Sequence, residues 1–178
     1  MLTLRSAVEA DAALAIALHC DAAVARWLWS ERRNFAEANE WFMTMLHSTV
    51  PPGGAILAVE EDRKIIGFVW FTQFMGPQAC MSMGFVRHRG QGLAAGVARL
   101  GIDYAFETLQ LHRLTATAAE ANEPARRLCE RYGILEGRLR QAWEYPAGEF
   151  LDVLVYGLLA KDWAERPTIQ EPESPAAG

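Results

Sequence analysis

Cysteine is scarce in this chain, and its placement excludes two kinds of stabilised fold. The three cysteines, Cys20, Cys80 and Cys129, lie far apart in the sequence. An odd number of isolated cysteines argues against a disulfide framework and against a cysteine-based zinc cluster. The four histidines are equally dispersed and show no metal-ligand spacing, so we expect no metal. This cysteine usage fits a reducing, cytoplasmic location best.

Excess positive charge and long apolar segments are also lacking. Lysine and arginine total 17 against 22 acidic residues, which gives a formal net charge of −5. Proteins that hold nucleic acid are usually basic, so we expect no nucleic-acid partner. No uncharged run approaches the length needed to cross a bilayer, and Glu9 and Asp11 interrupt the apolar N-terminal stretch, unlike in a signal peptide. We therefore expect no membrane partner.

What the chain does contain is a mixture of helical and strand periods. Its 178 residues are 51% apolar, which suits one globular domain that we assign to residues 1–166. The residues at 167–178, rich in Pro and Glu, are expected to form a flexible tail. The expected order begins with a strand at 2–5, helices at 10–19 and 35–47, and three antiparallel strands at 55–60, 64–71 and 79–86. It continues with a helix at 93–108, a strand at 112–118, a helix at 124–132 and two strands at 137–145 and 150–159. This order predicts an α/β domain with a mixed sheet, and not a doubly wound sheet or an α/β barrel.

The most informative segment joins a strand to a helix through a glycine-rich turn, Arg89-Gly90-Gln91-Gly92. The first turn of a helix has unpaired N–H groups and the positive end of the helix dipole. Glycines let a phosphate approach the backbone closely. The segment therefore predicts a pyrophosphate cradle, with Arg87 and Arg89 adding charge at its rim.

Other interpretations of this turn fit less well. Gly90-x-Gly92-x-x-Ala95 matches the dinucleotide fingerprint, but no acidic residue follows at a strand end about twenty positions later, where a ribose needs one. The segment also lacks the Gly-Lys-Ser/Thr of a nucleoside triphosphate loop. On this motif alone, a plain strand-to-helix turn without a ligand remains open.

Further motifs follow the turn in a consistent order. They are Arg-Gly-Gln-Gly-Leu-Ala (89–94), Tyr-Ala-Phe-Glu (104–107), Leu-His-Arg-Leu (111–114), Asn122 with Ala125-x-x-Leu128-x-Glu130-x-x-Gly133, Glu136-Gly137-x-x-Arg140, Gly148-x-x-x-Asp152 and Leu158-Leu159-x-x-Asp162-Trp163. From Gly90 to about Trp163 the chain resembles the GNAT superfamily of acetyltransferases, in the branch that includes the ribosomal-protein N-terminal (alanine) acetyltransferases. The N-terminal half matches only in the order of its elements. The resemblance implies a mixed, mostly antiparallel central sheet flanked by helices, and transfer of an acetyl group from acetyl-CoA to an amine by direct attack in a ternary complex.

The resemblance also places the acetyl-CoA cosubstrate. The strand edge at Ser82, Met83 and Gly84 corresponds to the backbone that pairs with pantetheine and orients the acetyl carbonyl. The motif that begins at Arg89 supplies the pyrophosphate N–H groups, which belong to Gly90, Gln91, Gly92, Leu93 and Ala94.

Asn122 matches the family asparagine that contacts the cofactor arm. The residue before a proline avoids helical angles, so we expect Glu123 to cap the next helix and to leave Asn122 for another partner. A simple turn role for Asn122 is the alternative.

The catalytic residues are less clearly marked. Many relatives have a tyrosine acid where this chain has Cys129. A thiol can donate a proton, although Cys129 also fits a small core residue. Tyr132 is the nearest other hydroxyl and fits a packed aromatic equally well. Thr117 stands where some relatives have a glutamate base, so no base is assigned and an ordered water is left to accept the proton.

The acceptor amine is expected opposite the cofactor, near Trp27, Trp29 and Glu31, with Trp70 and Phe71 as further candidates on the sheet. Core packing of the tryptophans and solvation of Glu31 are the alternatives. By resemblance the acceptor is a protein N-terminal α-amine, and a small-molecule amine such as an amino sugar, a polyamine or an antibiotic is the alternative. A catalytically silent acyl-CoA-binding module and a dinucleotide-binding protein are rival interpretations. The sequence fits a monomer and a homodimer equally.

Overall fold

The structure is a computed structural model that describes residues 1–28, 34–48, 56–86, 92–145 and 148–166. The predicted elements are present in the predicted order, and the 3-10 turn η1 (Glu9–Asp11) and the helices α2 (Ala22–Ala25) and α6 (Ala160–Ala164) are additional. The strands are β1 (Leu2–Ser6), β2 (Ile56–Glu61), β3 (Lys64–Thr72), β4 (Gln78–Phe85), β5 (Arg113–Ala119), β6 (Ile134–Tyr145) and β7 (Glu149–Leu159). The other helices are α1 (Ala12–Cys20), α3 (Phe35–Leu46), α4 (Ala94–Asp103), the π-helical turn η2 (Tyr104–Thr108) and α5 (Glu123–Tyr132). The tail expected at 167–178 lies outside the described residues.

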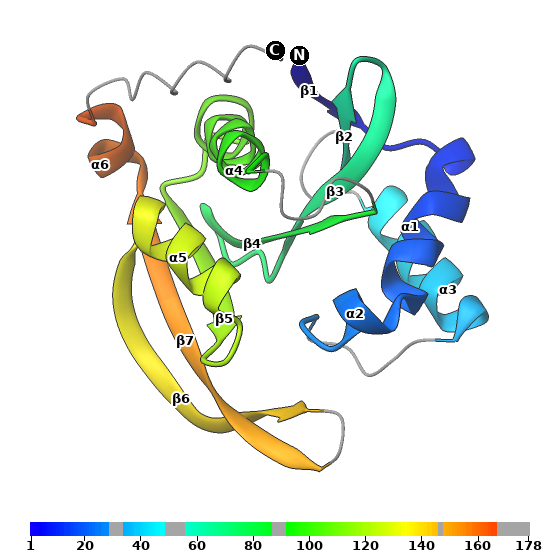
Figure 1. The fold of residues 1–178 in the computed structure, drawn as a ribbon. Coiled ribbons are helices and arrows are strands. Elements are labelled where there is room, and N and C mark those ends of the chain that lie inside the picture. Colours follow the sequence, from blue (N-terminus) through cyan, green and yellow to red (C-terminus); the bar gives the residue numbers. More distant parts are fainter. Residues whose placement is uncertain (29–33, 49–55, 87–91, 146–147, 167–178) are drawn as a thin grey trace, which may run out of the picture.

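The strands form one seven-stranded sheet in the order β1-β2-β3-β4-β5-β7-β6 (Figure 1). Every neighbouring pair is antiparallel except β4 and β5, which are parallel. The prediction of a mixed, mostly antiparallel sheet flanked by helices is therefore confirmed. The β2–β3 hairpin is also confirmed, and its two turn residues, Asp62 and Arg63, have φ of 50° and 66°, as a tight hairpin turn requires.

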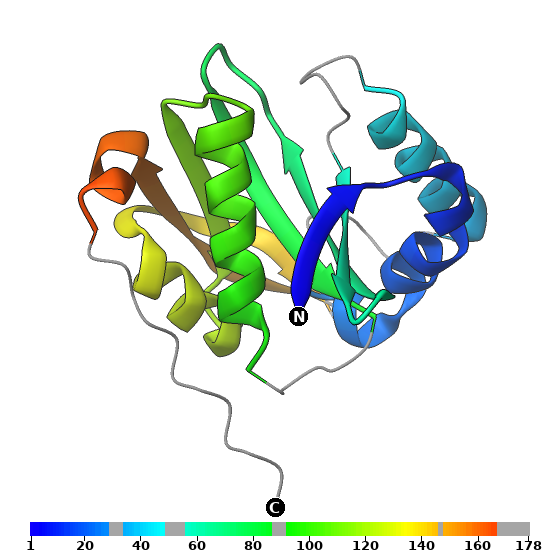
Figure 2. The ribbon, with the colours of Figure 1, turned by 90° about the horizontal axis from the view of Figure 1, so that it is seen from above.

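The first four strands are covered on both faces. Leu57, Val59 and Val69 point into a core with α4, whereas Ala58 and Phe68 point into a second core with α1 and α3. Figure 2 shows α4 on one side of the sheet and the α1–α3 pair on the other. Because side chains alternate along a strand, a strand buried on both faces is apolar at consecutive positions, as in the buried run of β2.

Helix α4 lies very close to the sheet because its contact face carries small residues. A Cβ atom at Gly101 would lie 2.9 Å from Sδ of Met81 and 3.3 Å from Cγ1 of Val69. The buried positions of α4 include Val97 and Gly101, whereas Thr108, in the turn that follows, is exposed. The α-helix also ends at Asp103 and continues as a π-helical turn, which is shorter than the α-helix expected over 93–108.

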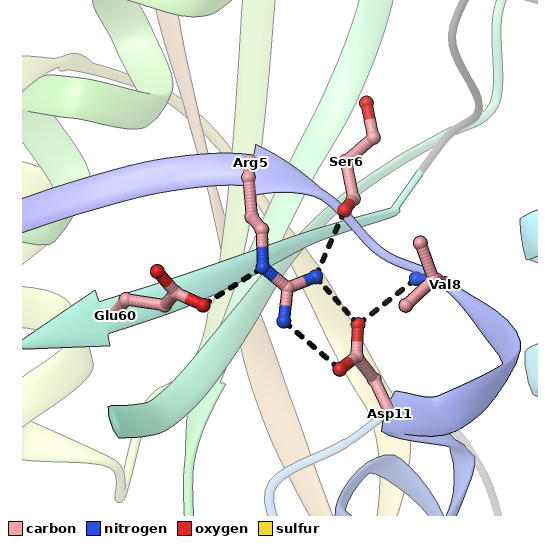
Figure 3. Close-up of polar contacts among 5 residues, drawn as sticks. All are labelled: Arg5, Ser6, Val8, Asp11 and Glu60. Atoms are coloured by element: carbon pink, nitrogen blue, oxygen red, sulfur yellow. Dashed lines mark hydrogen bonds and ion pairs between the residues drawn. The ribbon is translucent and has the colours of Figure 1, made fainter. Parts of the chain in front are cut away.

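A buried carboxylate ties the start of α1 to the edge of the sheet (Figure 3). Arg5 on β1 forms a bidentate ion pair with Asp11, in which Nη1 donates to Oδ2 at 2.7 Å and Nη2 donates to Oδ1 at 3.0 Å. Nε of Arg5 also donates to Glu60 on β2 at 2.8 Å. The backbone N–H of Val8 also donates to Asp11, at 2.9 Å. Burial alone would raise the pKa of Asp11, but the hydrogen bonds from Arg5 and Val8 and the positive charge of Arg5 outweigh burial, so the pKa is lowered.

Replacing Asp11 by Asn should lower the free energy of unfolding by about 2 kcal/mol at neutral pH, because the half-buried Arg5 loses its charged partner. A carboxylate whose folded pKa is depressed stabilises the fold above its unfolded pKa of about 3.9, and this contribution is lost as the pH falls through the folded value. The difference between wild type and variant should therefore shrink below about pH 4 in urea titrations.

Asp62→Asn is the matched control, because Asp62 forms a fully exposed pair with the N-terminal amine. Equal losses of stability in the two variants would contradict the structural role given to Asp11.

Candidate active site

The two central strands of the sheet separate partway along their length. The parallel ladder between β4 and β5 consists of Gln78↔Arg113, Ala79↔Leu114 and Cys80↔Thr115. Beyond this point β4 stays paired with β3 as far as Phe85, whereas β5 stays paired with β7. Within the described residues, one backbone edge of β4 from position 81 to position 85 therefore has no neighbouring strand. Figure 1 shows the two strands diverging.

Ser82, Met83 and Gly84, the predicted pantetheine-binding residues, lie on this open stretch of β4. A strand edge presents N–H and C=O groups that another extended chain can pair with. Glycine is needed at position 84 because a Cβ atom there would lie 2.9 Å from Cδ2 of the buried Leu18 on α1. Helix α1 thus packs directly onto the backbone of β4 where the edge is open.

The next helix after β4 in the chain is α4, and a glycine precedes it. Gly92 has φ +78°, a left-handed conformation that favours glycine, and α4 starts two residues later. Leu93 and Ala94 form the start of the helix, and Leu93, the N-cap, makes no side-chain capping bond. The first-turn N–H groups are thus left for an anion, as the pyrophosphate prediction requires. Arg89, Gly90 and Gln91 lie outside the described residues.

Asn122 has a different local role from the one predicted. Its Oδ1 accepts a hydrogen bond from the N–H of Ala125 at 3.4 Å, and its C=O accepts from Arg126 at 3.0 Å. Asn122 is therefore the N-cap of α5, and the expectation that Glu123 caps this helix is wrong. A proline disfavours the helical conformation in the residue before it but does not forbid it. Glu123, which precedes Pro124, belongs to the first turn of α5. The cap uses only the amide oxygen of Asn122, so a contact of its amide nitrogen with the cofactor stays a prediction.

Cys129 lies against the sheet on the α5 side, in a small cluster with Ala118, Leu154 and Tyr156. Burial, together with nearby Cys80 and Glu130, raises the pKa of the Cys129 thiol to about 11. Near neutral pH the group is thus a protonated thiol, which can donate a proton but is a poor nucleophile.

Tyr132, the other predicted hydroxyl, holds two helices together. Its side chain is 6% exposed, and its hydroxyl donates to the carbonyl of Ala95 in the first turn of α4 at 3.0 Å. Its ring packs edge-on against Trp163 at 5.8 Å. This geometry matches the packed-aromatic alternative, and the hydroxyl fixes the start of the helix predicted to bind pyrophosphate.

Tyr156 is a further hydroxyl beside Cys129 that sequence order did not reveal. It is 1% exposed and donates to Glu130 at 3.4 Å. Burial first, and then the proximity of Glu130 and Cys129, raises the pKa of Tyr156, so the phenol stays protonated. Strand alternation along β7 could have indicated it, because Leu154 and Tyr156 both point toward α5.

The face of the sheet opposite α4 and α5 carries Trp70, one of the predicted acceptor residues. Trp70 lies across from Ser82 in the ladder but is only 6% exposed, with its ring 5.6 Å from both His19 and Trp41. The core alternative therefore describes Trp70 better, since little of its surface is left to contact an acceptor. Trp29 and Glu31 lie outside the described residues.

Trp27 packs in a separate cluster with Ala119 and Val153, and with Trp143 and Leu151 of the β6–β7 hairpin. This cluster lies against the part of β5 that is no longer paired with β4. Trp143 and Leu151 are contributors that sequence order alone did not point to, because they come from the far end of the chain.

The described residues contain no group of three or more His, Cys, Asp or Glu side chains placed to hold a metal ion. In the same ranges, the helices are too short or too polar to cross a bilayer.

Comparison with known protein families identifies the family of this chain. The family model described as an acetyltransferase (GNAT) domain matches residues 1–134, which is most of the chain. The chain therefore belongs to the GNAT acetyltransferase family.

Individual relatives match over part of their length. A Bacillus subtilis protein named "Putative ribosomal N-acetyltransferase YdaF" is 38% identical over 74 residues, which cover 42% of this chain and 40% of the relative. The N-acetyltransferase p20 of Bacillus licheniformis, named as uncharacterized, is 26% identical over 61% of this chain and 62% of its own length. The matched part thus spans less than two thirds of either relative.

Solved structures show the same fold over nearly their whole length. The spermidine N-acetyltransferase of Vibrio cholerae, solved with CoA and spermine, has a TM-score of 0.81 at 23% identity, covering 92% of this chain and 98% of that chain. A GNAT-family acetyltransferase of Bacillus anthracis has a TM-score of 0.75 at 19% identity, covering 90% and 95%. At these identities the likeness establishes the fold alone.

The state of Cys129 leads to a testable prediction. With a thiol pKa of about 11, Cys129 should react slowly with iodoacetamide at pH 7.5, and its rate should climb steadily as the pH is raised toward 10. Cys20, which is partly exposed, should be alkylated first. Peptide mass spectrometry of a time course measures both rates, and fast alkylation of Cys129 at pH 7.5 in the folded protein would contradict the assignment.

Proposed function

We propose that this chain is an N-acetyltransferase that moves the acetyl group of acetyl-CoA to a primary amine by direct attack in a ternary complex. One observation carries the proposal: among the described residues the backbone edge of β4 from position 81 to position 85 has no neighbouring strand, and α4 follows it in the chain. This arrangement offers an extended hydrogen-bonding edge for pantetheine next to an anion site for the pyrophosphate.

In this proposal pantetheine pairs with the backbone of Ser82, Met83 and Gly84 as an added strand would. An N–H group of this edge also lies where it can stabilise the oxyanion that forms on the acetyl carbonyl. The pyrophosphate binds the N–H groups of residues 90–94, with Arg89 at the rim. Support for the second contact comes from the left-handed Gly92 and from the N-terminus of α4, where the N-cap Leu93 makes no side-chain capping bond.

The chemistry needs a nucleophile, a leaving group and two proton transfers. The amine nitrogen attacks the thioester carbonyl carbon, the C–S bond breaks, and the electron pair leaves with the sulfur of CoA. Cys129, protonated near neutral pH, is the proposed donor to that sulfur. Thr117 gives no carboxylate at the position where some relatives have a base, so water takes the proton of the acceptor ammonium and the neutral amine then attacks.

A protein N-terminal α-amine is the leading acceptor. The 38% identical relative is named as a ribosomal N-acetyltransferase, which supports this choice.

A small-molecule amine is the second candidate. The observation in its favour is the high structural similarity to enzymes named as spermidine N-acetyltransferases. A kinetic comparison separates the two acceptors: release of free thiol from acetyl-CoA should be faster with short peptides bearing a free N-terminus than with spermidine. Saturable transfer to spermidine alone would make the second candidate correct, and no turnover with any amine would leave a silent acyl-CoA-binding module.

The cofactor contact can be tested separately. Gly92→Asp should weaken acetyl-CoA binding by at least about tenfold in calorimetry, because the new carboxylate faces the pyrophosphate. Gly148→Asp is a matched control, since Gly148 has the same φ of +78° and open space around its Cα. Equal acetyl-CoA affinity in the two variants would rule out the phosphate site at α4.

A further inference from the structure

A single hydrogen bond joins two segments that lie 117 positions apart on the predicted acceptor side. Nε1 of Trp143, on β6, donates to the backbone carbonyl of Arg26, just after α2, at 3.1 Å. Trp143 is 5% exposed and packs with Trp27 and Leu151. In Figure 1 the β6–β7 hairpin bends toward the side of the molecule that carries α2.

An irregularity in β6 directs Trp143 toward this contact. The ladder with β7 passes from Leu139↔Val153 to Trp143↔Leu151, so that three residues of β6 stand opposite one residue of β7. Gln141 within this bulge has φ 49°, and its N–H donates to Asp152 at 2.8 Å. Such bulges bend a strand and re-aim its side chains. Asp152 thus holds the bend that brings the indole to α2.

The position of the contact gives it a role. The strands β4 and β5 separate after Cys80↔Thr115, and the Trp143 cluster runs along the separated part of β5 through Ala119. On the opposite face, the bond from Tyr132 to Ala95 joins α5 to α4. On each face, a hydrogen bond among the described residues therefore joins the part of the fold around β5 to β7 with the part around β1 to β4.

We propose that Trp143 is a positioning residue that fixes the segment after α2 against the β6–β7 hairpin and so sets the acceptor side of the site. This inference rests on the proposed transferase function. The indole does not touch the reacting atoms, so its loss should change how well the amine is bound and oriented, and not how acetyl-CoA is bound.

Trp143→Phe keeps an aromatic ring and removes the N–H donor. Its KM for the acceptor amine should rise about five- to tenfold, while its KM for acetyl-CoA should stay within about twofold of wild type. Asp152→Asn should shift acceptor KM in the same direction, because the bulge loses its charged hydrogen-bond acceptor.

Trp163→Phe is the matched control. Trp163 also donates through its indole N–H over a long sequence distance, to Asp103 at 2.8 Å, but it links α6 to the end of α4, away from the proposed acceptor side. Both variants should lower Tm by a similar few degrees, and only Trp143→Phe should raise the acceptor KM. An unchanged acceptor KM in folded Trp143→Phe, or the same rise in Trp163→Phe, would overturn the inference.

Amide hydrogen exchange separates this inference from the proposed function. Protection of residues 22–28 should fall in Trp143→Phe and not in Trp163→Phe, whatever the wild type acetylates. Unchanged protection would show that the bond does not hold the segment after α2. Absence of turnover by the wild type would overturn the proposed function and the acceptor role together.

Discussion

The separation of β4 from β5 after three residue pairs is the constraint on which the rest of the site depends. Strands β1 to β4 keep their own ladders and are covered by α1, α3 and α4, whereas β5, β7 and β6 form a second set with α5. A sheet that stayed paired along its whole length would bury the backbone edge of β4. The separation leaves that edge available to a linear ligand between two well-packed halves.

An opening of this kind needs support on both faces, since unpaired backbone edges weaken a sheet. The Tyr132–Ala95 bond joins α5 to α4 on the side proposed to bind the cofactor, and in our proposal the Trp143–Arg26 bond supports the opposite face. Neither bond is at the predicted point of chemistry.

The sequence predicted the elements of the fold well because hairpin turns, glycine breaks and apolar periods are local signals. It also predicted the glycine turn from the residues themselves, and the strand edge at Ser82, Met83 and Gly84 through resemblance to a family. The local proline rule favours Glu123 as the helix cap, but Asn122 caps α5 through a local bond to Ala125. Trp70, expected near the acceptor, packs against His19 and Trp41, and these tertiary contacts leave no local pattern in the sequence. The contacts of Trp143 and Tyr156 depend on the pairing and bulges of β6 and β7, which no local pattern reports.

The most direct test of this account is an experimental structure of the protein with acetyl-CoA bound. The account predicts that the pantetheine arm lies between β4 and β5, with its amide groups within about 3 Å of backbone N–H and C=O groups of Ser82, Met83 or Gly84. The pyrophosphate should lie at the start of α4. A cofactor bound elsewhere, with the edge of β4 unoccupied, would contradict the central claim.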